Sequence, residues 1–168
     1  MKKLILGIAL LLVVVFSISS CIKNETTPPA TTCTPVNITA PSAEVATLKT
    51  YLDSVGIVAT QDNRGFFYSF DTTGATDTLH PTPCSDVSVT YRGTYLNGTT
   101  FDSSHVTSPI AFNLSRVIAG WQEALPLMKR NAVMNLYLPP SLAYGSTDYQ
   151  GIPANSYLIF KIRLFDFD

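Results

Sequence analysis

Residues 87–95 read VSVTYRGTY, and apolar and polar side chains alternate along the first part of this stretch with a period of two. That period is typical of a β-strand with one buried face, on which the odd-numbered side chains would lie. Asn97-Gly98 follows, and this dipeptide is the strongest short signal for a tight hairpin. The stretch therefore predicts a long strand that turns at Asn97 and returns from Phe101 onward.

Similar patterns on both sides of this hairpin predict an antiparallel sheet. Further strands are expected at residues 65–70, 110–114, 132–138 and 156–167. Between them, apolar side chains from Val117 to Met128 recur at helical spacing, so we expect a helix over 116–128, which Pro126 could shorten. The expected fold is α+β, with five to six antiparallel strands and one main helix packed on the sheet.

The first twenty residues have the layout of a secretory signal peptide. Two lysines precede an apolar stretch over 4–18, which is short for a membrane span of about twenty residues. The sequence ISSC at 18–21 resembles a bacterial lipobox, in which the cysteine becomes the lipidated first residue of the mature protein. By this resemblance Cys21 is a lipid anchor in the cell envelope, at the outer membrane. An uncleaved N-terminal anchor and a secreted protein with an incidental Cys21 remain as alternatives.

Cys33 and Cys84 are left once Cys21 is assigned to the anchor. An even pair of cysteines in an oxidising compartment predicts one disulfide. Metal binding is the alternative interpretation, but His80 and His105 are the only histidines, and the chain has no Cys-x-x-Cys spacing. No metal and no cofactor is therefore expected.

Composition shifts divide the chain further. Residues 22–41 are rich in threonine and proline and are interpreted as a flexible tether. From Ser42 an apolar stripe at helical spacing predicts a helix over 42–54 that ends before Gly56. This stripe would pack on the main domain or, as an alternative, form a dimer contact. The expected segments are a signal peptide at 1–20, the lipidated cysteine and tether at 21–41, an accessory helix and connector at 42–63, and the main domain at 64–168.

The composition also excludes classes of function. The net charge is -1 and no basic run occurs, so nucleic-acid binding is not expected. The chain has no Gly-x-Ser-x-Gly motif, no phosphate-binding loop and no dinucleotide fingerprint. It does contain nine phenylalanines, eight tyrosines and one tryptophan, most of them after residue 65. Some of these rings could line a cavity rather than fill the core.

Several blocks of sequence resemble one family in order and spacing. The blocks are VSVTYRG at 87–93, NGTTFDSS at 97–104, FNL at 112–114, VIAGWQE at 117–123, LAYG at 142–145 and GIPANSYLIF at 151–160. Together they resemble the FKBP-type peptidyl-prolyl cis/trans isomerases over about residues 64–168. The resemblance implies a twisted antiparallel sheet wrapped around a short helix. It also implies isomerisation of X-Pro bonds in extracytoplasmic polypeptides, which would assist their folding.

The resemblance assigns roles to ten residues. The positions that match the catalytic residues are Tyr91, Phe101, Asp102, Tyr144 and Phe160. The positions that match the bowl holding the prolyl ring are Ile110, Val117, Ile118, Trp121 and Ile152. Trp121 would form the floor, while the Ile118 N–H and the Tyr144 hydroxyl would hold peptide carbonyls. Proline-containing polypeptides are the implied partners, and macrolide inhibitors of the family are a further implied class of ligand.

Several departures from the family pattern are visible, and three of them concern the site. No Arg or Lys follows in 106–109 to pair with Asp102, Ile110 stands where an aromatic residue is common, and Tyr149 stands where many members have histidine. These departures keep two alternatives open on the same scaffold. One is a non-catalytic chaperone that binds proline-containing peptides, and the other is an interaction lipoprotein.

Overall fold

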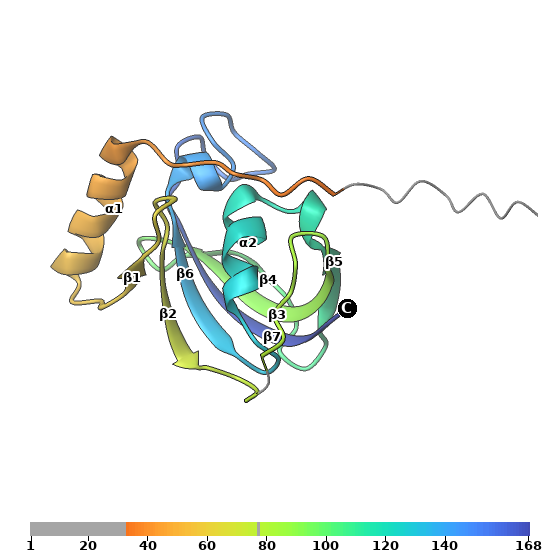
Figure 1. Ribbon diagram of the computed structural model, residues 1–168. Helices are drawn as coiled ribbons and strands as arrows, with labels where there is room; N and C mark the ends of the chain where they lie inside the picture. The colour runs from red at the N-terminus through yellow and green to blue at the C-terminus, as the bar shows by residue number, and fades with distance from the viewer. Residues whose placement is uncertain (1–32, 77) are drawn as a thin grey trace, which may run out of the picture. The chain divides into compact units, whose positions relative to one another are not determined.

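The computed structural model describes residues 33–76 and 78–168 (Figure 1). The predicted signal peptide, the Cys21 anchor and the part of the tether before Cys33 lie outside the described residues. Within the described residues, no helix is both long enough and apolar enough to cross a membrane.

A seven-stranded antiparallel sheet forms the framework, in the order β1-β2-β6-β7-β3-β4, with β5 also paired to β3. The strands are β1 (Thr60–Gln61), β2 (Phe67–Thr72), β3 (Asp86–Tyr95), β4 (Thr100–Ser103), β5 (Ile110–Asn113), β6 (Val133–Leu138) and β7 (Leu158–Phe167). Six of them correspond to predicted strands. The additional one, β1, has two residues, which is too short to produce a periodic signal.

The two long strands β3 and β7 lie side by side and carry the clearest alternation. Val87 and Val89 are buried on β3, as expected from the period of two. On β7 the even-numbered side chains from Leu158 to Leu164 are buried, whereas Lys161 and Arg163 are exposed. One face of this strand pair therefore belongs to the core and the other faces outward.

The main helix is shorter than the periodicity suggests. It is α2 (Ala119–Ala124), preceded by the 3-10 turn η1 (Leu114–Arg116) and followed by the 3-10 turn η2 (Leu125–Leu127). Pro126 lies inside η2 and has no N–H to continue α-helical bonding, so the expected shortening is observed. Trp121, Leu125 and Met128 are buried as predicted, and α2 lies across the curved sheet in Figure 1.

The helix predicted over 42–54 is α1 (Ser42–Ser54). Leu48 and Leu52 are buried in a cluster with Phe67 of β2 and Tyr137 of β6. The neighbours of Tyr137 along β6 belong to the main core beneath α2. Because successive strand residues point to opposite faces, α1 covers the face of the sheet opposite to α2. The apolar stripe thus packs on the domain itself.

A disulfide joins Cys33 to Cys84 across 51 residues of chain, which confirms the predicted pairing. It attaches the start of the described chain to the segment that leads into β3. The bond restricts the unfolded chain more than the folded one, because it closes a long loop.

We expect the double variant Cys33→Ser/Cys84→Ser to unfold with a free energy about 2–4 kcal/mol lower than the wild type, because the long loop is no longer closed. Urea denaturation of a soluble form that begins at residue 22 would measure this. Reductant should lower the stability of the wild type by a similar amount and leave the double variant unchanged. Equal midpoints for oxidised wild type and double variant would contradict a stabilising role.

Candidate functional site

A cavity of about 280 Å³ opens where α2, the sheet and the loop after β6 meet. Its lining consists of Tyr91, Asp102, Phe112, Arg116, Val117, Ile118, Trp121, Tyr144, Tyr149 and Phe160. Strands β3, β4, β5 and β7 each contribute one of these residues. The site therefore exists only once four strands and the α2 region have come together.

Seven of the ten residues assigned from the sequence line this cavity, and Phe101, Ile110 and Ile152 do not. Phe101 packs behind the wall, with its ring centroid 5.6 Å from that of Phe160. Ile110 is the first residue of β5 and is 41% exposed. Ile152 is buried and pairs through its backbone with Tyr149.

Three lining residues were not assigned from the sequence, namely Phe112, Arg116 and Tyr149. Phe112 could have been found, because it lies two residues after Ile110 on the same face of a predicted strand. Tyr149 lies on a loop, where no periodicity exists to indicate which way a side chain points. Arg116 ends the 3-10 turn η1, which the sequence pattern merged into a longer helix.

The floor of the cavity is the Trp121 ring, which is 4% exposed. Three other rings meet it edge to face, with centroid distances of 5.3 Å to Tyr91, 5.8 Å to Phe112 and 5.4 Å to Phe160. Edge-to-face pairs add stability beyond their buried area and restrict ring orientation. The floor and the three rings that meet it therefore form one rigid, largely apolar surface.

Phe101 supports this wall from the far side, and Gly93 makes room for it. A Cβ atom at Gly93 would lie 2.5 Å from the Phe101 ring, so no other residue fits there without moving the ring. Phe101 also packs on Tyr95, at a centroid distance of 5.2 Å. A residue that does not touch the cavity thus fixes the position of Phe160, which does.

Asp102 has a tyrosine partner in place of the absent basic one. The Tyr91 hydroxyl donates a hydrogen bond to Asp102 Oδ2 at 2.6 Å. Burial, with the Asp102 hydrogen bond and charge as further causes, raises the pKa of Tyr91 above its ordinary value. The phenol therefore stays protonated and donates to the carboxylate at neutral pH.

The opposite lip of the cavity carries Tyr144 and Tyr149, whose rings stack with centroids 4.7 Å apart. Two backbone hydrogen bonds, of 2.9 and 2.8 Å, join Tyr149 and Ile152 and hold this part of the loop together. Burial raises the pKa of Tyr144, with nearby Tyr149 and Asp102 as smaller causes.

Within the described chain, neither the Tyr144 hydroxyl nor the Ile118 N–H has a hydrogen-bond partner. Both remain available to a ligand.

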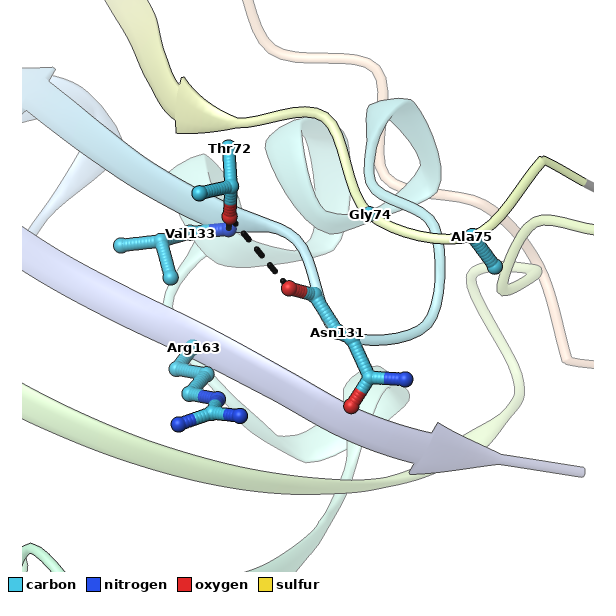
Figure 2. A pocket seen from close by; sticks show the side chains of 6 residues that line it. All are labelled: Thr72, Gly74, Ala75, Asn131, Val133 and Arg163. Carbon is cyan, nitrogen blue, oxygen red and sulfur yellow. Dashed lines mark hydrogen bonds between the residues drawn. The ribbon is translucent and has the colours of Figure 1, made fainter.

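A second hollow, of about 450 Å³, shares no lining residue with the first (Figure 2). It is formed by Thr72, Gly74, Ala75, Asn131, Val133 and Arg163. The Thr72 hydroxyl is already bonded there, to the Asn131 carbonyl at 3.4 Å and the Val133 N–H at 3.1 Å. No aromatic ring lines this hollow, so it offers no surface comparable with the Trp121 floor.

These features define an aromatic bowl with hydrogen-bond donors at its rim, as suits a peptide site for a compact apolar ring. Among the described residues, no group of three or more His, Cys, Asp or Glu side chains could hold a metal ion. The cavity can bind a ligand through its shape, its apolar surface and a few polar contacts.

Comparison with known proteins identifies the class. The family model for the FKBP-type peptidyl-prolyl cis-trans isomerase matches residues 78–165, just over half of the chain. The protein therefore belongs to this family. The crystal structure of FkpA from Escherichia coli superposes with a TM-score of 0.66 and 32% identity, over 76% of this chain and 60% of that one.

Two relatives in sequence cover different shares of the chain. The FKBP-type peptidyl-prolyl cis-trans isomerase FkpA of Buchnera aphidicola is 39% identical over 120 residues, which are 71% of this chain and 46% of the relative. The outer membrane protein MIP of Legionella longbeachae is 43% identical over 86 residues, which are 50% of this chain and 37% of the relative. The chain thus spans less than half the length of these two relatives.

We expect kcat/KM on a prolyl peptide to change by less than about twofold from roughly pH 6 to pH 9, because both raised tyrosine pKa values lie above this range. Activity should fall only in more alkaline solution, where the phenols lose their protons. A protease-free assay in constant ionic strength would measure the profile. A step near neutral pH would mean that a group other than Tyr91 and Tyr144 controls the site.

Proposed function

We propose that the protein is a peptidyl-prolyl cis/trans isomerase that acts on X-Pro bonds of extracytoplasmic polypeptides and assists their folding. The observation that carries the proposal is the Trp121 floor, held by three edge-to-face rings in a cavity of a chain that belongs to this family. The substrate prolyl ring would lie on this floor.

The origin of the barrier to X-Pro rotation explains why an apolar cavity can accelerate this rotation. Rotation about an X-Pro bond is opposed by amide resonance, with a barrier of roughly 18–20 kcal/mol. In the transition state the bond is twisted, resonance is lost and the carbonyl oxygen carries less negative charge. An apolar cavity disfavours the planar, more polar ground state relative to the twisted one, and shape complementarity adds to this difference. Neither a nucleophile nor a metal is required.

The rim residues would orient the peptide. The Ile118 N–H and the Tyr144 hydroxyl, both without partners among the described residues, would donate to peptide carbonyls. Asp102 and the Tyr91 hydroxyl form a fixed polar edge on the opposite side. In this proposal the catalytic residues are Tyr91, Asp102, Tyr144 and Phe160, while Phe101 acts by holding Phe160 in place.

The N-terminal sequence supports a location in the cell envelope for this activity. A signal peptide at 1–20 would be removed, and a lipid on Cys21 would hold the domain at the outer membrane, followed by a tether. The disulfide between Cys33 and Cys84 is consistent with an oxidising compartment. The Legionella relative is named an outer membrane protein, and this name also supports a location in the cell envelope.

One observation favours a second candidate, a non-catalytic binder of proline-containing peptides. Ile110 is 41% exposed and does not line the cavity. The part of the bowl that it was expected to form is therefore formed by other residues. A binder would use the same bowl without accelerating rotation. Only a rate measurement separates the two functions.

We expect the soluble protein from residue 22 onward to accelerate isomerisation of a prolyl tetrapeptide in a protease-free assay. Tyr144→Phe should lower kcat/KM by about tenfold, because one hydrogen bond to the peptide is lost. Trp121→Ala should lower it further, although this change also removes core packing. Tyr157→Phe, which removes a hydroxyl outside the cavity, is the matched control. A folded wild type with no acceleration would leave the binder as the function.

A further inference from the structure

Residues 33–54, which we call the N-terminal brace, run along the domain rather than away from it. The brace begins at the Cys33–Cys84 disulfide. Its Ile38 N–H donates to Glu123 Oε1 at 2.9 Å, and its Ala40 N–H donates to the Arg64 carbonyl at 2.8 Å. In Figure 1 this orange segment passes above α2 before α1 begins. The brace therefore contacts the helix that carries the cavity floor.

The second half of the brace, α1, is held firmly against the sheet. Leu48 and Leu52 are 0% and 2% exposed. The Tyr51 hydroxyl donates to the Leu96 carbonyl at 2.8 Å. Gly65 has a φ of +99° and approaches so closely that a Cβ there would lie 2.7 Å from Val45. Side chains on the first turn of α1 thus project from a fixed support.

Glu44, on that first turn, reaches a segment 97 residues away in sequence. Its Oε2 accepts a hydrogen bond from the Ser141 N–H at 3.0 Å. Ser141 lies in the 3-10 turn η3 (Pro140–Leu142), which ends two residues before Tyr144. Glu44 is half-buried, so its carboxylate is partly shielded from water at this contact.

The Ser141 N–H belongs to the same planar peptide group as the Pro140 carbonyl. That carbonyl oxygen accepts hydrogen bonds from the Ala143 N–H at 3.0 Å and the Gly145 N–H at 2.9 Å. Ala143 and Gly145 are the two neighbours of Tyr144. Glu44 therefore fixes one end of a peptide group whose other end closes the turn that presents Tyr144 to the cavity.

We propose that Glu44 is a positioning residue for the prolyl site, holding the Tyr144 lip in its binding geometry through the Pro140–Ser141 peptide group. The bond from Ser141 is charge-assisted, which makes it stronger than a neutral one. Negative charge at the N–H also polarises the attached carbonyl, so the two bonds flanking Tyr144 strengthen together. The proposal rests on the proposed function, because Tyr144 is taken to hold the peptide.

The other contact of the brace is with α2, the helix that carries the floor. Glu123 lies two residues after Trp121 and is 2% exposed. Its Oε1 is bonded to Ile38, and Arg64 Nε lies 3.9 Å from its Oε2. The brace thus joins the floor, through α2, to the lip, through Glu44.

The test compares Glu44→Ala and Glu44→Gln with Asp53→Ala, which removes an exposed carboxylate from the same helix. In Glu44→Ala, we expect amide hydrogen exchange at Ala143 and Gly145 to accelerate by about tenfold, as loss of one charge-assisted hydrogen bond would produce. KM for a prolyl tetrapeptide should rise about fivefold while kcat stays within about twofold, because the lip must be ordered at each binding event. Glu44→Gln, which keeps an acceptor oxygen, should restore part of both effects, and Asp53→Ala should match the wild type.

Unchanged exchange at Ala143 and Gly145 in a folded Glu44→Ala protein would overturn the proposal. Accelerated exchange with an unchanged KM would overturn it as well, since the carboxylate would then stabilise the turn without serving the site. A wild type without isomerase activity would remove the proposed function instead. In that event, the affinity for the peptide, measured by Trp121 fluorescence, replaces KM and still decides the role of Glu44.

Discussion

The edge-to-face packing of Trp121 against Tyr91, Phe112 and Phe160 is the interaction on which the site depends. The three partners come from β3, β5 and β7, whereas Trp121 comes from α2. The contact therefore requires the helix to lie across the sheet at one depth and one angle. The same packing fills the core and leaves an apolar floor, so stability and ligand binding share one set of side chains.

A site of this kind has little need of titrating groups. Tyr91 and Tyr144 have raised pKa values because they are partly buried. Asp102 is engaged by the Tyr91 hydroxyl in place of a basic residue. The departure at Asp102 is therefore compensated within the cavity rather than left open. Selective binding of a twisted amide by apolar surface and fixed donors is consistent with this arrangement.

The residues that hold the cavity in shape extend well beyond its lining. Phe101 supports Phe160 from behind, and the N-terminal brace reaches both the α2 helix and the turn before Tyr144. The brace is itself attached through a disulfide and through the packing of α1. Segments outside the family match at 78–165 thus take part in shaping the site.

The sequence by itself determined six of the seven strands, the disulfide pair, the helix at 42–54 and most of the cavity lining. These features depend on local periodicity, on cysteine count or on short motifs at fixed spacing. It did not determine that Ile110 would be exposed, that Phe112 and Tyr149 would line the cavity, or that Glu44 would bond to Ser141. Such contacts join residues far apart in the chain or on irregular loops, where no period indicates direction, so only tertiary packing decides them.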